Sequence, residues 1–296
     1  MQAAPRGAGG TATRVPTAWS DSNSAVGAPL ITFLSDYGHS DEFVGVCHGV
    51  IAGRCPQARV IDITHTIARH DVREGALVLR DALVHMPVGV HLAVVDPAVG
   101  HHARRAVALR TLVEDRVLVG PDNGLLMLAA ERLGAAVEVV DIGQSPQRRE
   151  PVSATFHGRD IFAPVAAAIA GGAKLGDVGD PLAPAELRRL ALPTASVREG
   201  VLAAHVLRAD HFGNLMLNAS HQEIVETGVR LGGLLSVEGG GRVHAGRYAT
   251  TFADVAPGEL LLYEDALGMA ALAVNRGSAA NFLRVGHDEE LLVRPA

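Results

Sequence analysis

The stretch LITFLSDYG, residues 30–38, joins a short apolar run to a polar turn, and this arrangement recurs along the first half of the chain. Runs this short, bounded by glycine, proline or aspartate, are typical of strands buried on both faces of a sheet. The further runs are Val60–Ile63, Val90–Val95, Val107–Leu109, Val117–Val119 and Val137–Val140.

Helical patterns lie between these runs, at Glu42–Ala52, Val72–His85, Asn123–Leu133 and Ile161–Ala170. For the second of them we expect Asp71 as the N-cap, with Glu74 as its capping-box partner. Strands that alternate with helices predict an α/β domain with a mostly parallel central sheet. We place this N-terminal domain at residues 29–192.

The pattern changes after about Pro193. Short strand-like runs now follow one another without helices, at Val201–Leu207, Asn214–Leu217, Gly232–Val237, Arg242–Tyr248 and Glu259–Tyr263. Three glycines, residues 239–241, indicate a hairpin, because no strand-to-helix GxGxxG context surrounds them. We therefore expect a C-terminal all-β barrel domain at residues 199–296. Residues 1–28, rich in Ala, Gly, Pro, Thr and Ser, are expected to form a disordered extension.

The composition restricts the class of function. The net charge of -6 argues against nucleic-acid binding, which needs a basic surface. We find no signal-peptide pattern and no apolar stretch near the roughly 20 residues of a membrane span. The two cysteines, Cys47 and Cys55, are expected to be reduced and buried. We therefore expect a cytoplasmic protein that contacts neither membrane nor nucleic acid.

Known catalytic and cofactor motifs are missing from the sequence. There is no GxSxG, no Walker loop and no HExxH. His65 with His70, or His101 with His102, can be imagined as metal ligands, but His157 has no second ligand at helical spacing. We expect no metal and no cofactor.

Polar side chains follow several of the expected strands. Asp36, Asp96 and Asp122 stand just after such runs, and His157 stands just before a helical pattern. Ligands of open α/β sheets bind outside the carboxyl ends of strands. Each residue alone is more typical of a cap or turn, but together they favour one site.

Eight ordered motifs between Leu30 and Val285 resemble the S-adenosylmethionine hydroxide adenosyltransferase family, to which fluorinase and chlorinase are related. The motifs are FLSDYG (33–38), DITH (62–65), DVREGA (71–76), VVDP (94–97), VGPDNG (119–124), TFHGRD (155–160), DHFGN (210–214) and TFAD (251–254). The resemblance implies an N-terminal α/β domain, a C-terminal barrel, and a homotrimer with active sites between subunits.

The resemblance also implies a catalytic set of Asp96, Arg104 and His157. The halogenases have Tyr in place of Asp96 and of His157, and fluorinase has a halide-contacting Ser in place of Gly158. The set found here therefore points to water as the nucleophile, with His157 as base or water-orienting group. The loop before Arg104 is one residue longer than the family pattern and has Ala98 where the family has Gly. Arg105 therefore remains an alternative to Arg104.

Further positions match the family's substrate-binding residues. Asp36 corresponds to the acid on the ribose diol, Asp41 and Asp210 to acids at the methionine end, Asn214 to the adenine-reading amide, and Phe252 to the residue on the purine. His70, Ala266, Val274 and Arg276 complete the expected substrate-binding set.

The resemblance implies an enzyme that hydrolyses S-adenosylmethionine to adenosine and methionine through attack at the ribose 5′ carbon. Two alternatives remain open from the residues. One is a halogenase that makes a 5′-halo-adenosine, and the other is a non-catalytic protein that binds adenosine or S-adenosylmethionine.

Overall fold

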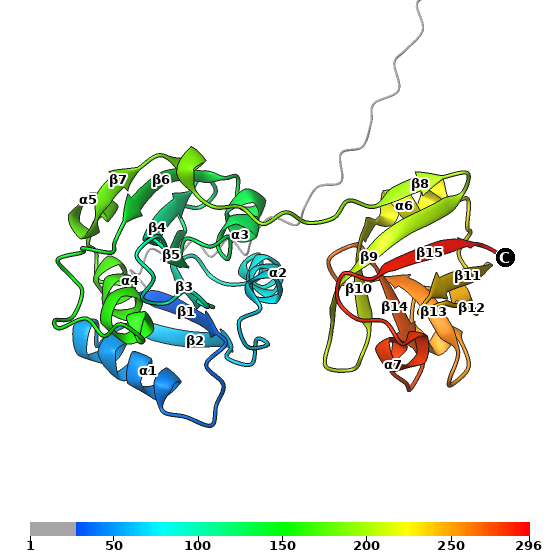
Figure 1. Cartoon of the computed structure of the whole chain (residues 1–296), viewed down its shortest axis with the longest axis horizontal. Helices are drawn as coiled ribbons and strands as arrows, with labels where there is room; N and C mark the ends of the chain where they lie inside the picture. Colours follow the sequence, from blue (N-terminus) through cyan, green and yellow to red (C-terminus); the bar gives the residue numbers. More distant parts are fainter. Residues whose placement is uncertain (1–27) are drawn as a thin grey trace, which may run out of the picture.

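The computed structural model describes residues 28–296, which form two lobes, each built on its own sheet (Figure 1). The expected disordered extension lies outside the described residues, apart from Ala28. None of the helices within residues 28–296 combines the length and the apolar character needed to cross a membrane.

The first lobe contains a seven-stranded sheet in the order β2-β1-β3-β5-β4-β6-β7. The pairs β1–β2, β1–β3 and β3–β5 are parallel, whereas β4 and β7 run against their neighbours. The α/β prediction is therefore confirmed, with antiparallel strands towards one edge. The strands are β1 (Leu30–Ser35), β2 (Arg59–Thr64), β3 (Val90–Val94), β4 (Ala106–Thr111), β5 (Val117–Pro121), β6 (Ala136–Asp141) and β7 (Asp180–Leu182).

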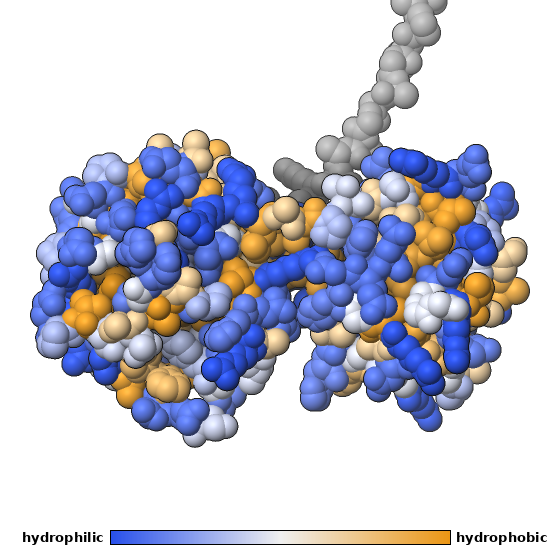
Figure 2. Space-filling view, in the orientation of Figure 1, coloured by the Kyte–Doolittle hydropathy of each residue, from blue (hydrophilic) through white to orange (hydrophobic). Residues whose placement is uncertain are grey.

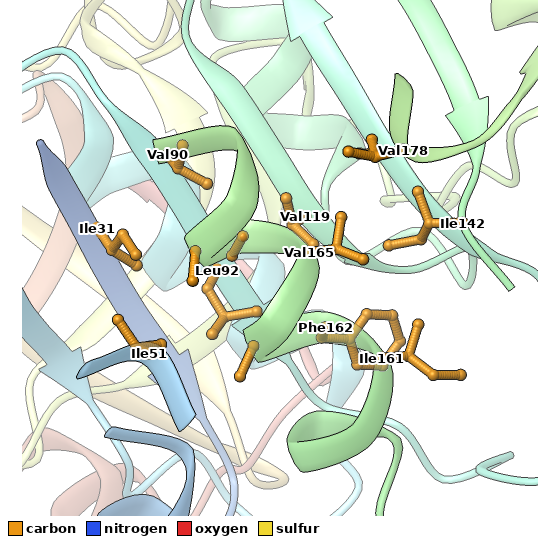
Figure 3. Packing of buried hydrophobic residues seen from close by; sticks show 14 of the residues in the cluster. Ile31, Ile51, Val90, Leu92, Val119, Ile142, Ile161, Phe162, Val165 and Val178 are labelled. Carbon is orange, nitrogen blue, oxygen red and sulfur yellow. The ribbon is translucent and has the colours of Figure 1, made fainter. Parts of the chain in front are cut away.

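Helices cover both faces of this sheet. On one face α1 (Phe43–Arg54), α4 (Ala163–Ala170) and α5 (Leu175–Val178) pack over the central strands, and Figure 3 shows the apolar side chains that meet there. On the other face α2 (Val72–Leu83) and α3 (Met127–Arg132) enclose a second core. The small side chains of α4 allow it to lie close to the strands.

The start of α2 follows the expected capping only in part. Asp71 Oδ1 accepts a hydrogen bond from the Glu74 amide at 2.8 Å, which confirms the N-cap. The Glu74 carboxylate does not reach back to the N-cap amide. It accepts from the Ala68 amide instead, at 2.8 Å. Glu74 therefore ties the incoming loop to the helix.

The second lobe is a barrel, as predicted. Its strands follow the order β10-β14-β13-β12-β11-β15-β9, and pairing between β9 and β10 closes a ring of seven, with β8 added beside β9. Apolar side chains that point inward fill it. The elements are β8 (Ser196–Arg198), β9 (Val201–Ala209), β10 (Leu215–Ser220), α6 (His221–Glu226), β11 (Leu234–Gly239), β12 (Arg242–Tyr248), β13 (Leu260–Glu264), β14 (Met269–Val274), α7 (Ala279–Leu283) and β15 (Glu290–Pro295).

The glycine hairpin connects β11 to β12. Gly240 and Gly241 have φ values of 57° and 73°, the left-handed region that a two-residue hairpin turn requires. Ion pairs join the two lobes at α2, where Arg73 pairs with Asp288 and Asp81 lies 3.8 Å from Arg208.

Candidate active site

A cavity of about 540 Å³ opens at the carboxyl ends of β1 and β3. Asp36 follows β1, Asp96 follows β3, and His157 precedes η1 (Gly158–Phe162), a π-helical turn that leads into α4. The lining residues are Asp36, Tyr37, Gly38, Asp41, Phe43, Arg69, His70, Val94, Asp96, Val99, Thr155, Phe156, His157 and Gly158. Asp36, Asp96 and His157 therefore share one cavity, as expected from their positions at the ends of elements.

Asp96, Arg104 and His157 meet at one end of this cavity. Arg104 Nη2 lies 2.9 Å from Asp96 Oδ2 and also contacts His157 Nδ1. Arg104 is only 7% exposed, and its guanidinium lies 5.4 Å from the centre of the Phe162 ring. This packing fixes a charged side chain between the carboxylate and the imidazole.

The contact with Arg104 sets the protonation of His157. A guanidinium has donors and no acceptor, so Nδ1 must accept from Arg104. The neutral ring then carries its proton on Nε2. Burial, followed by the positive charge of Arg104, lowers the pKa of His157 and keeps the ring neutral.

Asp96 is the anionic partner of Arg104. Its pKa is raised by burial, against the opposing effect of Arg104. Within residues 28–296 neither carboxylate oxygen has a well-aligned hydrogen-bond partner, although Oδ2 lies beside Arg104. A buried carboxylate with free lone pairs can accept a proton from a neighbouring water.

The alternative arginine has another place. Arg105 Nε donates to Asp122 Oδ2 at 3.0 Å, and its Nη2 donates to the Glu186 carbonyl. Asp122 Oδ1 also accepts from the Arg188 amide at 2.8 Å. Asp122 and Arg105 therefore hold the segment that leaves the first lobe, away from the cavity, and Arg104 is the arginine beside His157.

Three of the expected substrate-binding residues line the same cavity. Asp36 Oδ2 accepts from the His70 amide at 2.9 Å, which ties the end of β1 to the loop before α2. His70 adopts a positive φ of 66°, and Asp41 lies at the exposed rim.

One wall of the cavity is aromatic, and its residues are absent from the set expected from sequence. Phe156 packs edge to face against both Tyr37 and Phe43, and Tyr37 and Phe43 pack at a tilt, with ring centres 5.2–5.9 Å apart. Tyr37 is partly buried, and desolvation raises its pKa well above the ordinary value. The sequence carries a signal for two of them, because Tyr37 follows Asp36 in FLSDYG and Phe156 precedes His157 in TFHGRD.

The remaining expected residues lie in the second lobe. Asp210, Asn214 and Ala266 line a separate cavity of about 210 Å³, together with Arg208, Tyr263 and Asp265. Asp210 accepts from the Phe212 and Asn214 amides and from Asn214 Nδ2, all at 2.8–2.9 Å. The Asp210 carboxylate thus holds its own loop.

Phe252, Val274 and Arg276 line neither of these two cavities. Phe252 is 42% exposed and packs on Tyr263, whereas Val274 is buried in the barrel core. Within one chain the expected residues therefore fall into two separate groups, with Asp96 in the cavity of the first lobe and Asn214 in the cavity of the second.

Comparison with known proteins agrees with this division. Residues 31–179 match the SAM hydroxide adenosyltransferase N-terminal domain, and residues 204–292 match the C-terminal domain of that family. The chain belongs to the SAM hydroxide adenosyltransferase family.

Relatives in this family carry two different names. The chain is 48% identical over 267 residues to the (R)-S-adenosyl-L-methionine hydrolase of Salinispora tropica, covering 90% of this chain and 97% of the relative. It is 38% identical to the hydrolase of the same name from Thermus thermophilus, covering 86% and 94%. A fluorinase from Actinoplanes sp. is 31% identical, also covering 86% and 94%.

Solved structures of this family share the fold. An uncharacterized conserved protein from Thermotoga maritima superposes with a TM-score of 0.83 at 35% identity, over 89% of this chain and 99% of that one. Similarity to both named activities leaves the choice between them to the residues in the cavity.

Proposed function

We propose that this protein hydrolyses S-adenosylmethionine to adenosine and methionine. The observation that carries the proposal is the buried Asp96–Arg104–His157 group at the end of the 540 Å³ cavity. The relatives with the highest identities reported above are named as hydrolases of the (R)-sulfonium epimer, and we propose the same preference here.

In the proposed reaction a water oxygen attacks the ribose 5′ carbon. The new C–O bond forms as the C5′–sulfur bond breaks, and its electron pair goes to the sulfonium, which leaves as the neutral thioether of methionine. The water proton passes to Asp96 and then to solvent. The raised pKa of Asp96 brings it closer to neutral pH, where a general base works best.

His157 and Arg104 hold the reacting water and the carboxylate. The tautomer fixed by Arg104 makes Nε2 of His157 a donor, so we propose that it orients the water oxygen rather than taking the proton. Arg104 keeps Asp96 ionised beside a cationic substrate. Holding water against carbon in one geometry contributes up to ~7–11 kcal/mol to lowering the barrier.

The other residues are assigned to binding. Asp36 would accept from the ribose hydroxyls with Oδ1, because Oδ2 is engaged by the His70 amide. Asp41 and His70 would contact the substrate from the same lobe. Six residues would contact the substrate from a barrel domain: Asp210, Asn214, Phe252, Ala266, Val274 and Arg276.

We propose that this barrel belongs to a neighbouring subunit of a homotrimer. Two observations support the assembly. The two groups of expected residues in one chain lie in separate cavities, and Phe212, in the loop held by Asp210, leaves 75% of its surface exposed. Apolar areas interrupt the polar surface of the barrel lobe (Figure 2). An exposed aromatic beside one of these cavities favours a covering partner.

The proposed reaction uses no cofactor, since the sulfonium substrate is already activated. A cytoplasmic location is part of the proposal and is supported by the two buried, unpaired cysteines, Cys47 and Cys55.

The proposal is tested by turnover in ¹⁸O-water, with adenosine analysed by mass spectrometry. We expect the label in the 5′-hydroxyl and an unchanged rate when chloride or fluoride is added. Formation of a 5′-halo-adenosine would identify a halogenase. Binding of S-adenosylmethionine without any product would support a non-catalytic protein.

A further inference from the structure

A second cluster of chemically active side chains lies at the edge of the first lobe, outside the cavity. His48 on α1, Asp62 on β2 and His65 just after β2 bring one ligand atom each within 4.8 Å of one another. None of the three lines the active-site cavity. We propose that His48, Asp62 and His65 bind a divalent transition-metal ion of the zinc type.

The donor atoms converge on one carboxylate oxygen. His48 Nε2 lies 2.9 Å from Asp62 Oδ1, and His65 Nε2 lies 3.0 Å from the same atom. Two imidazoles and a carboxylate are the donor set of many zinc sites, with water in the fourth position. Zinc bonds of about 2.0–2.2 Å would require these donors to separate by only a few tenths of an ångström.

His65 is oriented as a metal ligand should be. Its side chain is completely buried, and Nδ1 lies 2.7 Å from the Ser35 hydroxyl oxygen. If Nδ1–H donates to Ser35, the lone pair of Nε2 is left to point at the cluster. A hydrogen bond on the remote ring nitrogen is the usual support of a metal-bound histidine.

The buried nitrogen also lacks another partner. Within residues 28–296, His65 Nε2 has no well-aligned hydrogen bond, although it lies close to Asp62. Buried polar atoms are normally satisfied, and a cation bound between Nε2 and the carboxylate would satisfy both. The edge-to-face packing of His65 on Phe33, with ring centres 4.6 Å apart, holds this ring in place.

The bound ion would stabilise the fold and take no part in the reaction. β2 is the edge strand of the sheet, and the ion would tie it to α1. Ser35 links the cluster to the end of β1, directly before Asp36. Binding to the folded state alone stabilises that state in proportion to the logarithm of ion concentration over Kd.

The test uses untagged, full-length protein treated with a chelator and then dialysed. Calorimetric titration with ZnCl₂ should give one ion per chain, and zinc should raise Tm by several degrees. Co²⁺ in the same site should give visible d–d absorption. The two informative variants are His48→Gln and Asp62→Asn, whose side chains are exposed enough (36% and 39%) for folding to survive.

Loss of a direct ligand should weaken zinc binding by more than the ~10–100-fold typical of outer-shell changes. The matched control is His221→Gln, which removes an exposed histidine paired with a single carboxylate, Glu264, at 2.7 Å. It should bind zinc like the unaltered protein. The proposal is overturned if the unaltered protein binds no stoichiometric zinc, or if His48→Gln and Asp62→Asn bind it as tightly as His221→Gln.

Discussion

Single side chains in the cavity divide into groups that act on water and groups that hold the nucleoside. We predict that Asp96→Asn and His157→Ala each lower kcat by ~10²–10⁴-fold and leave adenosine affinity within a few-fold. Interactions made mainly in the transition state affect kcat when they are lost. Steady-state kinetics and calorimetry with adenosine measure the two effects separately.

Asp36→Asn provides the contrasting variant, because Asp36 should contact the ribose diol. It should weaken adenosine binding more than the Asp96 or His157 substitutions do. Because the catalytic residues act as a unit, the double variant should be little worse than the poorer single one. Near-normal turnover by folded His157→Ala would make His157 a structural residue at the start of η1.

The directions of the pKa shifts predict an acid limb in the pH profile of kcat. Asp96 titrates above the ordinary 3.8 because burial disfavours its charged form, and His157 titrates below the ordinary 6.5. As pH falls, protonation of Asp96 removes the proton acceptor, and protonation of His157 adds a second cation beside Arg104. Activity should therefore be complete near neutral pH and lost on acidification.

This acid limb should persist in Asp36→Asn, which leaves both groups in place. A kcat that stays flat while the protein remains folded in acid would contradict the assignment of Asp96 as base.

The residues of this group show what sequence could supply. The sequence singles out Asp96 and His157 as polar residues at element ends, and it favours Arg104 without excluding Arg105. Both follow the same loop, and the fold reveals that Arg105 pairs with Asp122 while Arg104 contacts Asp96 and His157. The tautomer of His157 likewise depends on a partner 53 positions away in the chain.

At the scale of elements, the loop after β1 lies so close to η1 that position 158 must be glycine. A Cβ placed there would lie 2.0 Å from the Tyr37 hydroxyl oxygen. We predict that Gly158→Ala destabilises the protein by about 1–3 kcal/mol, as overpacking does. Tyr37→Phe in the same chain should recover part of this loss, because the nearest remaining ring atom lies 3.0 Å away.

Thermal unfolding of the single and double variants measures this contact. Gly176→Ala is the matched control, since a Cβ there meets nothing within 4 Å. Equal Tm values for Gly158→Ala and Gly176→Ala would show that Tyr37 moves aside freely. The same contact leaves no room for the serine that fluorinase has at this position, unless Tyr37 moves.

The sequence predicts the strands and helices whose hydrophobic period is clear. It does not predict elements that form only through pairing with distant parts of the chain. The buried strands and α2 follow from apolar runs and an N-cap. The run expected as a helix from Asn123 begins only at Met127, because Asn123 and Gly124 form a turn in which the Asn123 side chain accepts from the Leu125 amide. β14 and β15 were not predicted, since their sequences become strands through barrel closure.

At the scale of the whole molecule, the proposed site draws residues from both lobes. The sequence suggested two domains and one composite site. The structure gives each lobe its own cavity, with Asp96 in one and Asn214 in the other. If a neighbouring barrel completes each site, a chain with a damaged first lobe and a chain with a damaged barrel should form intact sites together.

The last prediction follows from this separation. His157→Ala damages only the first lobe, and Asn214→Ala damages only the barrel, so each variant alone should be nearly inactive. Co-expressed with two different tags and purified as mixed trimers, they should regain activity, because some sites then pair an intact first lobe with an intact neighbouring barrel. In a cyclic trimer that contains both variants, roughly a third of the sites would be intact. The matched control is the pair Asp96→Asn and His157→Ala, which damages the same lobe twice and should recover nothing.

Size-exclusion chromatography would report the assembly, and product formation per chain would report the intact sites. Equal activity of the two mixtures would mean that each site is built within a single chain, and the lobes would then have to close on each other for the Asn214 group to reach the substrate.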